Sequence, residues 1–385
     1  MGKCRVAIVH NIIAPYRIPI FEELGKNPLI DLKVFYCTET HSERNWEVNA
    51  CETYDYTILP GTCVQVGHIR YHVNPSIVRE LLRGNYDVVI IGGCTDFTTQ
   101  MAFVASKILD LPVILWSEAI KEAESRLGKL IMPISKYIIS HASAVLVPGS
   151  RSRDYHIMKG AHPDAILIAH NIVDNERLIN TSHNFWENRT NIKEELKLDG
   201  KKVVVFFGQL IQRKGVNYLI DAFKLLQNEF NDVCLLIGGD GVQRITLEEH
   251  CIQNGIKNVY FLGWQSETNK IKYCSIADVF VLPTLEDLCP LVLNEAMCCK
   301  LPVVSTLKAG CAHDMVRASE NGFIVRDKSA KELYVAMKTI LSNDELRAQM
   351  GETSLDIIKT EYNVGNTVES FVEAILRVVH KKNFK

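Results

Sequence analysis

The sequence carries no excess of charge of either sign. Its 385 residues include 43 lysines and arginines against 45 aspartates and glutamates, which gives a formal net charge of -2. This balance lacks the positive field that non-specific binding to nucleic acid requires. The chain has no long tract rich in proline, glycine or serine, and 47% of its residues are hydrophobic. We therefore expect neither nucleic-acid binding nor global disorder.

Long apolar runs and CxxC cysteine pairs are missing as well. No apolar run approaches the ~18 residues of a membrane-spanning helix, and the chain opens with strand-like KCRVAIVH rather than with a leader. These features predict a cytoplasmic protein. The 12 cysteines are dispersed, so we expect reduced and mostly buried thiols, with Cys298 and Cys299 packed in the core.

Short apolar runs alternate with longer segments of helical period. The predicted strands are 5–10, 32–36, 87–91, 112–116 and 144–148 in the first half, and 203–207, 233–237, 259–262, 279–282 and 303–305 in the second. Apolar runs without polar alternation are typical of parallel strands covered on both faces. The order therefore predicts an α/β protein with two Rossmann-like domains.

The same pattern suggests where the domains divide. We expect an N-terminal domain at 1–178, a C-terminal domain at 179–365, and a last helix at 366–385 that packs back on the first domain. The polar stretch 180–200 is the expected linker, with one short helix. Open α/β sheets bind ligands outside the carboxyl ends of their strands, so the residues after each strand are the candidates for a site.

One loop of this kind reads GQLIQRKG, from Gly208 to Gly215. Arg213 and Lys214 precede a predicted helix, whose positive dipole end favours acids rather than bases. Both cations are explained if an anion such as a diphosphate binds there with the helix-start amides. The alternative is a pair of solvated surface cations. The apolar face of the helix is expected to comprise Val216, Leu219, Ile220 and Phe223.

A second loop and helix read PTLEDLCPLVLNEAM. Pro290 is expected at the first helical position, which leaves the amides of Leu291 and Val292 for a phosphate. Asp287 lies in the loop, and Glu295 lies one turn into an apolar helix. A buried carboxylate is costly unless it accepts hydrogen bonds, and the hydroxyls of a ribose and a sugar are suitable donors.

These motifs resemble the GT-B retaining glycosyltransferases of family 4, the glycosyl transferases of group 1. The D-x7-E spacing from Asp287 to Glu295, followed by AM, LPVVST and an AG loop, is similar to their E-x7-E region. The other matching segments, in order, are APYRIPIFEEL, HNIVD, FGQLIQRKG, IGGDG, FLGW, ADVFVLPT and ENGFIV. The resemblance covers nearly the whole chain and implies two Rossmann-like domains whose parallel sheets face each other across a cleft.

The resemblance also implies roles for individual residues. Glu295 would bind the ribose hydroxyls and Asp287 the donor-sugar hydroxyls, while Lys214 and Arg213 would neutralise the diphosphate. Glu118, after the strand 112–116, would lie near the reacting sugar, or would instead orient the acceptor or cap the next helix. The remaining donor-binding residues would be Gly208, Gln209, Gly239, Gly263, Trp264, Leu291, Val292, Arg17 and Tyr16. For Arg17, pairing with a surface acid is an equal alternative.

Several positions depart from the family pattern. Asp287 replaces the usual first glutamate, Gln209 stands where many members have arginine, and 288–290 replace a glycine-containing turn. Because of these changes, the identity of the donor sugar nucleotide is not predicted by the resemblance. The changes also keep three alternatives: a sugar-nucleotide epimerase, a phosphorylase, and a catalytically silent subunit that binds a nucleotide sugar.

The expected reaction uses no metal ion and no cofactor. No D-x-D triplet, with which metal-dependent sugar transferases hold a cation, occurs. His68 and His72 are four residues apart, but their segment reads at least as well as strand or turn, so we do not expect these histidines to bind a metal. We expect a UDP- or GDP-sugar as donor, hexosyl transfer with retained anomeric configuration, and leaving-group stabilisation by basic groups and amides. The expected acceptor is a glycan or lipid-linked glycan of surface polysaccharide or glycoconjugate synthesis.

The segment 126–144 bears on the acceptor. It spaces apolar residues as one helix face, with three basic residues nearby. Core packing is favoured, and the alternative is peripheral contact with the inner face of a membrane, which would suit a lipid-linked acceptor. The apolar residues are Leu127, Leu130, Ile131, Ile134 and Ile138, and the basic ones are Arg126, Lys129 and Lys136.

Overall fold

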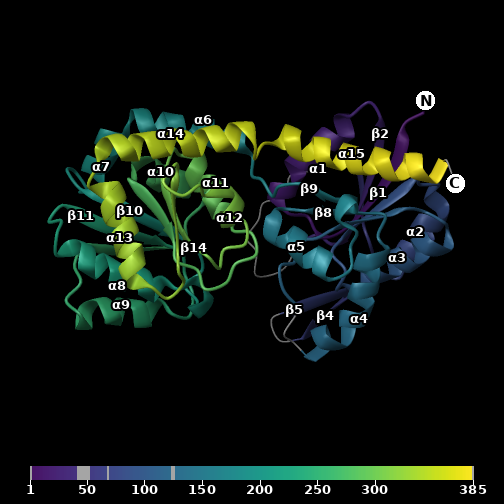
Figure 1. Ribbon diagram of the computed structural model, residues 1–385, viewed down its shortest axis with the longest axis horizontal. Coiled ribbons are helices and arrows are strands. Elements are labelled where there is room, and N and C mark those ends of the chain that lie inside the picture. Colours follow the sequence, from purple (N-terminus) through teal and green to yellow (C-terminus); the bar gives the residue numbers. More distant parts are fainter. Residues whose placement is uncertain (1, 41–52, 67–68, 123–125, 384–385) are drawn as a thin grey trace. The chain divides into compact units, whose positions relative to one another are not determined.

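The computed structural model describes residues 2–40, 53–66, 69–122 and 126–383 (Figure 1). The chain divides into two compact units, of which the first comprises Met1–Ile172 with Val364–Lys385 and the second Val173–Asn363. Each unit contains a parallel sheet with helices packed against it. The prediction of an α/β protein with two parallel-sheet domains is therefore confirmed.

The sheet of the first unit has the strand order β3-β2-β1-β6-β7-β8-β9, and every pair in it is parallel. Its strands are β1 (Cys4–Ile12), β2 (Ile30–Thr38), β3 (Asp55–Ile58), β6 (Val88–Gly92), β7 (Val113–Trp116), β8 (Ala144–Val147) and β9 (Ile166–Ile168). An antiparallel hairpin adds β4 (Thr62–Val66) and β5 (Ile69–Val73). The helical segments are η1 (Pro15–Arg17), α1 (Ile18–Lys26), α2 (Ser76–Gly84), α3 (Phe97–Ile108), α4 (Arg126–His141), α5 (Ser150–Met158), η2 (Pro163–Ala165) and α15 (Val364–Asn383).

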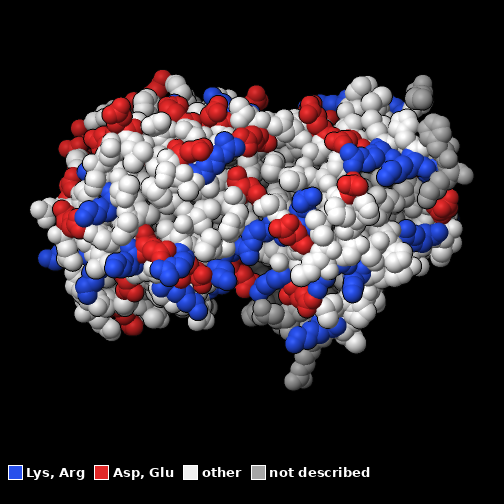
Figure 2. All heavy atoms as spheres, viewed as in Figure 1, with Lys and Arg blue, Asp and Glu red and all other residues white. Residues whose placement is uncertain are grey.

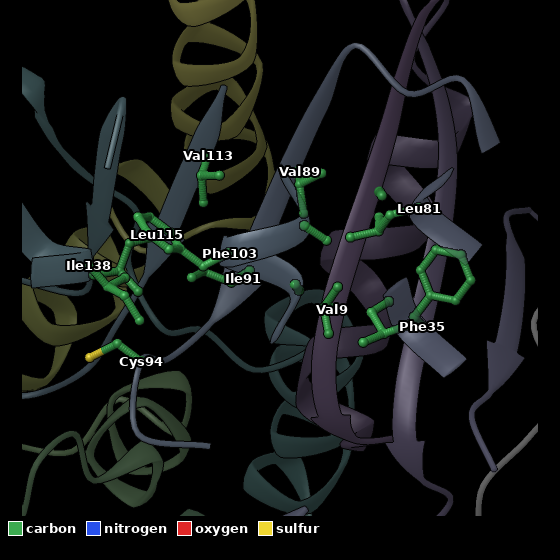
Figure 3. Packing of buried hydrophobic residues seen from close by; sticks show 14 of the residues in the cluster. Val9, Phe35, Leu81, Val89, Ile91, Cys94, Phe103, Val113, Leu115 and Ile138 are labelled. Carbon is green, nitrogen blue, oxygen red and sulfur yellow. The ribbon is translucent and has the colours of Figure 1, made fainter. Parts of the chain in front are cut away.

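Alternate residues of these strands face opposite sides, so one sheet supports two apolar layers. On one side Val9, Val89 and Leu115 pack against Phe103 of α3 and Ile138 of α4 (Figure 3). Helices α1 and α15 contact the sheet and each other. Burial on both faces explains why these strands read as continuous apolar runs.

The C-terminal helix α15 packs within the first unit, although it follows the second unit in sequence. It contacts α1, β8 and β9. Its Phe371 is fully buried and meets the indole of Trp116 edge to face, with ring centres 4.8 Å apart. The chain thus returns to the first unit through an aromatic contact at the carboxyl end of β7.

The sheet of the second unit has the order β12-β11-β10-β13-β14-β15. Its strands are β10 (Lys202–Phe207), β11 (Val233–Gly238), β12 (Val259–Gly263), β13 (Val279–Leu282), β14 (Val303–Thr306) and β15 (Gly322–Val325). Its helical segments are α6 (Asn175–Glu187), α7 (Arg189–Glu195), η3 (Gln212–Lys214), α8 (Val216–Gln227), α9 (Arg244–Gln253), α10 (Glu267–Ile276), α11 (Leu291–Cys298), α12 (Ala312–Met315), α13 (Ala330–Leu341) and α14 (Asp344–Thr360). The predicted apolar face of α8 is confirmed, since Val216, Leu219, Ile220 and Phe223 are fully buried.

The prediction for 180–200 was wrong. In place of a linker with one short helix, the end of α6 and the whole of α7 occupy it. The side chain of Asp174 caps α6 by accepting a hydrogen bond from Arg177 N. Leu178 of α6 and Ile192 of α7 are buried, and both helices pack against α10. So few buried positions leave a mostly polar sequence, which hides the helical period.

The state of the cysteines and the distribution of surface charge agree with what the composition predicts. Every cysteine among the described residues is a free thiol, and Cys298 and Cys299 are buried, as predicted. Acidic and basic side chains are intermingled over the visible face of both units (Figure 2). Within the described ranges, no helix combines the length and apolar character needed to cross a bilayer.

Candidate functional site

The chain reverses its direction of travel across the second sheet at β10. From β10 it moves outward to β11 and β12, then returns to the other side of β10 for β13 and continues to β14 and β15. In open α/β sheets, ligands bind beside such a reversal, outside the carboxyl ends of the two central strands. The loops that follow these two strands are 208–215 and 283–290, the two that sequence analysis singled out.

Glycines leave the backbone bare at the carboxyl ends of β10, β11 and β12. Gly208 N donates to Gly238 O at 3.0 Å, and Gly239 N donates to Gly263 O at 2.7 Å. Gly239 has a φ of +130°, and a Cβ there would lie 1.8 Å from Gly208 O. No other residue fits this position, because the Gly208 backbone approaches Gly239 so closely.

Lys214 and Asp287 form an ion pair between the two loops. Lys214 closes η3, and Gly215, with a φ of +64°, turns the chain into α8. The Lys214 ammonium pairs with an Asp287 carboxylate oxygen, and the two side chains are 11% and 14% exposed. An anion arriving at the start of α8 would therefore share Lys214 with Asp287.

Backbone hydrogen bonds fasten the two loops to each other. Arg213 O accepts from Leu285 N at 2.7 Å and from Thr284 Oγ1 at 3.0 Å. Asp287 O accepts from Gly310 N at 2.8 Å, which ties the loop to the segment after β14. These bonds fix the loop backbones on both sides of the ion pair, so its geometry is set by the fold.

Other predicted residues of this edge lie at the surface. The side chain of Arg213 is exposed, and its Nη1 donates to Glu286 O at 3.2 Å. Gln209 is exposed, and Trp264 is 67% exposed. Arg213 and Lys214, adjacent in sequence, thus occupy different environments: the ammonium is buried beside Asp287 and the guanidinium faces solvent.

Helix α11 begins at Leu291, one residue later than predicted. Pro290 is the N-cap, with a ψ of 101° that is extended rather than helical, so its expected place as first helical residue was wrong. Leu291 and Val292 are the first two helical residues. Their amides have no partner inside the helix, and no side chain caps this end.

Glu295 lies one turn further along α11 and has a cationic partner in α10. Lys270 Nζ is 2.6 Å from both carboxylate oxygens of Glu295. The two side chains are 24% and 13% exposed. The carboxylate keeps further lone pairs for hydroxyl donors, because one ammonium occupies only part of its accepting capacity.

In the first unit, Arg17 is buried at the carboxyl edge of the sheet. Its Nη2 pairs with Glu118 Oε1, and its Nη1 donates to Asn171 Oδ1 at 2.8 Å. Its guanidinium carbon lies 3.9 Å from the ring centre of Trp116, and Tyr16 flanks it at 5.1 Å. The structure thus brings Arg17, Tyr16 and Glu118 together, with the acid as partner of the arginine.

His10 stands next to this cluster, at the end of β1. It is buried, and desolvation together with the Arg17 charge lowers its pKa to about 3. Its ring packs against Trp116, with centres 5.5 Å apart, and its Nδ1 lies 3.2 Å from Ile12 O. His10 is therefore a neutral imidazole around pH 7.

Sequence reasoning missed Lys270, Asn171 and His10. Lys270 has no motif of its own, and only the tertiary fold places it on Glu295. Asn171 lies inside the HNIVD segment, and His10 is the last residue of the first predicted strand. Position at the carboxyl end of a strand was therefore a usable signal for His10, whereas Lys270 carried none.

The helix α4 divides its apolar residues between two environments. Ile131 and Ile138 are buried in the first unit, as core packing requires, whereas Leu130 is 74% exposed and Ile134 is 48% exposed. Lys129 and Lys136 are exposed on the same helix. The side chains of Arg126 and Leu127 lie outside the described residues, as does His68.

The chain is similar to known glycosyltransferases in sequence. Residues 187–355 match the family model described as glycosyl transferases group 1. An uncharacterized glycosyltransferase of Methanocaldococcus jannaschii is 26% identical over 298 residues, which cover 74% of each chain. The alpha-D-kanosaminyltransferase of Streptomyces kanamyceticus is 25% identical over 273 residues, covering 68% of this chain and 69% of that one.

Solved structures give the fold. HepE of Anabaena, crystallised in complex with UDP, aligns with a TM-score of 0.77 at 16% identity, covering 97% of this chain and 100% of that one. This likeness and the two parallel-sheet units define the fold as GT-B. The family match and the relatives support a glycosyltransferase of group 1.

Proposed function

We propose that this protein transfers a sugar from a nucleotide-diphospho-sugar to a glycan or lipid-linked glycan, with retention of anomeric configuration and without a catalytic metal ion. The observation that carries the proposal is the Lys214–Asp287 pair in the loops that follow β10 and β13, where the strand order reverses. Around it lie bare glycine backbone and two helix N-termini without side-chain caps. This combination suits a ligand that is both a diphosphate and a polyol.

The diphosphate would bind at the start of α8. The amides of Val216 and Asn217, the first two residues of α8, have no partner inside the helix and lie at the positive end of its dipole. Lys214 adds a full charge at the same place. Together they would neutralise the negative charge that builds on the departing nucleotide, in the way that preorganised donors stabilise an oxyanion. Arg213, exposed beside them, would contribute a longer-range field.

The two carboxylates would hold hydroxyl groups. Ionised carboxylates accept hydrogen bonds and donate none, so Glu295 suits the ribose and Asp287 the donor sugar. Asp287 also pairs with Lys214, which links recognition of the sugar to the cation that holds the phosphate. Asp287 is shorter than the glutamate usual in the family, and its pairing with Lys214 would take the place of the longer side chain in positioning the carboxylate.

Retention follows if attack and departure use the same face of the sugar. The anomeric carbon–oxygen bond to the β-phosphate breaks as the acceptor oxygen bonds to that carbon. The acceptor proton passes to a β-phosphate oxygen, so no side chain has to act as base. Lys214 and the α8 amides would stabilise the phosphate during this step.

A uridine diphosphate donor is favoured. HepE of Anabaena has been crystallised with UDP and with UDP-glucose. Trp264 follows Gly263 at the end of β12 and offers an exposed aromatic surface next to the glycine edge. Stacking on such a surface suits a nucleobase.

The cluster of the first unit would serve the sugar or the acceptor. Arg17 holds Glu118 by an ion pair and is itself held by Asn171 and Trp116. The carboxylate is one-third exposed and so remains available to a hydroxyl. We assign Glu118 to a reacting-sugar or acceptor hydroxyl and Arg17 to positioning it.

A panel of UDP-, GDP-, ADP- and dTDP-sugars tests the proposal. A donor that binds only the folded chain raises its apparent stability, and the selected donor is then incubated with candidate acceptors for product analysis. A new α-linked glycoside from an α-linked donor supports the proposal. Isomerised nucleotide sugar without a glycoside indicates an epimerase, and binding without turnover indicates a silent subunit. Turnover that requires added divalent cation would refute the metal-free mechanism.

A further inference from the structure

A second cluster of reactive side chains lies in the first unit, away from Arg17 and Glu118. Cys37 is near the end of β2, His72 is in β5, and Asp96 is the N-cap of α3. One ligand atom of each, the thiol sulfur, an imidazole nitrogen and a carboxylate oxygen, lies within 4.8 Å of the other two. The side chains of His72 and Asp96 are only 3% and 14% exposed. Three residues far apart in sequence thus converge on one point.

Cys63 supplies a fourth candidate ligand. It lies directly opposite His72 in the antiparallel β4–β5 hairpin. Side chains of directly opposed residues project to the same face with Cβ atoms ~5 Å apart. Cys63 is exposed, whereas Cys37 and His72 are buried.

We propose that Cys37, Cys63, His72 and Asp96 bind one zinc ion. Thiolates, imidazole and carboxylate oxygen are all ligands of zinc, and four of them give the tetrahedral coordination that it takes in structural sites. Bond lengths of ~2.0–2.3 Å in a tetrahedron separate the ligand atoms by about 3.5 Å. In the structure the ligand atoms of Cys37, His72 and Asp96 lie within 4.8 Å of one another, so side-chain movement would bring them onto one ion.

The surrounding hydrogen bonds hold the ligands in place. Asp96 Oδ1 accepts from Thr98 N and His72 N, both at 3.2 Å, and Asp96 Oδ2 lies 2.7 Å from His72 Nδ1. Thr98 Oγ1 donates to His72 O at 3.0 Å, and Asn74 Nδ2 donates to Cys37 O at 3.0 Å. The contacts from Thr98 and Asn74 are outer contacts, which orient metal ligands, whereas the contact of His72 Nδ1 with Asp96 Oδ2 joins two of the proposed ligands.

The alternative is a metal-free core in which His72 and Asp96 form a buried hydrogen-bonded pair. In that state burial keeps the Cys37 thiol protonated, because it raises the pKa of the thiol well above its ordinary value. Zinc binding replaces the protons of the two thiols, which are released to solvent. The ion would tie the β4–β5 hairpin to the carboxyl edge of the sheet and to the start of α3. This role is independent of the proposed sugar transfer.

Cobalt substitution tests the proposal on the full chain. The protein is stripped of metal under reducing conditions and titrated with Co²⁺. We expect one equivalent to bind, with near-ultraviolet thiolate-to-cobalt charge transfer and the strong visible bands of a tetrahedral site, and Zn²⁺ to displace it. Cys37→Ser and Cys63→Ser should each weaken binding by at least ~100-fold, more than loss of an outer-shell contact does. Cys94→Ser, which removes a buried thiol of the same unit outside the cluster, should leave it unchanged.

Two results would overturn the proposal. One is the absence of thiolate-to-cobalt absorption in the wild-type chain. The other is binding that survives both cysteine substitutions in variants whose circular dichroism matches the wild type. X-ray absorption of the zinc-loaded wild type counts the sulfur ligands without any variant, and a count below two also contradicts the site. None of these readouts depends on turnover, so failure of the proposed transfer would leave them intact.

Discussion

The ammonium of Lys270 lies 2.6 Å from both carboxylate oxygens of Glu295, which joins α10 to the first turns of α11. Both side chains are largely buried. Removing one partner leaves the other charge poorly solvated, which is more destabilising than loss of an exposed ion pair. The contact therefore fixes the carboxylate that we assign to the ribose.

This contact makes the two residues energetically coupled. We expect Lys270→Met, Glu295→Gln and the double variant to show a coupling energy of about 1–3 kcal/mol in urea unfolding. Glu295→Gln should also weaken nucleotide-sugar binding, measured by calorimetry. A coupling near zero, or unchanged affinity in Glu295→Gln, would contradict the role given to the pair.

Lys214 should matter far more to turnover than another lysine of the same region. Lys214→Ala removes the charge that offsets the departing diphosphate, so we expect the barrier to rise by ~2–4 kcal/mol, as for loss of an oxyanion donor. Lys224→Ala, at an exposed position of α8, should leave turnover near wild type. Initial rates at saturating donor measure both. Near-normal turnover of Lys214→Ala would remove this residue from catalysis.

Gly239 is expected to tolerate no side chain. In Gly239→Ala the new Cβ would meet the carbonyl oxygen of Gly208, so we expect ~1–3 kcal/mol of destabilisation from overpacking and loss of donor binding. Gly255→Ala is the matched control, since it has a positive φ of +65° but open space for the Cβ. It should show only the backbone strain, about 1 kcal/mol, and bind donor normally. Equal behaviour of the two variants would contradict the close-approach argument.

His10 should impose a pH dependence on stability. Its pKa is lowered to about 3 by burial and by Arg17, whereas the unfolded chain has the ordinary value of ~6.5. Between these values the unfolded state binds more protons, so the free energy of unfolding falls as the pH drops, by at most about 1.4 kcal/mol per unit. Above ~6.5 the contribution is fully present.

Urea unfolding of wild type and His10→Gln at several pH values measures this effect. The difference between the two chains should change between pH ~6.5 and 4 and stay constant above that range. His156, whose pKa burial also lowers, acts in both chains and cancels from the difference. A difference that does not vary with pH would show that His10 titrates normally.

Contact of α4 with a membrane is the prediction that bears on the acceptor. Leu130 and Ile134 are exposed near Lys129 and Lys136, a combination that favours an anionic bilayer surface. We expect flotation with vesicles that contain anionic lipid at low salt, and its loss in Leu130→Glu/Ile134→Glu. Leu225→Glu, at an exposed leucine of the second unit, serves as control. Absence of flotation of the wild type would dismiss the membrane contact.

The candidate site residues were largely predictable because they lie in loops between strands and helices with a clear pattern of apolar residues. The buried strands and α8 carry their pattern in apolar residues, and loop chemistry such as QRKG stands out against it. The failures had the same origin: α6 and α7 bury too few side chains to show a helical period. Pro290 was misplaced by one residue because ψ at a helix start depends on the incoming loop.

The sequence by itself determined the two α/β halves, the loops that follow their strands, and the candidate anion- and hydroxyl-binding residues, since these depend on local periodicity and composition. Only the tertiary structure decided which of those residues meet. It buried Lys214 on Asp287, left Arg213 in solvent, matched Glu295 with Lys270, and gathered Cys37, His72 and Asp96 from three elements. Such partnerships join positions tens of residues apart, and their geometry depends on strand order and packing that no local pattern encodes.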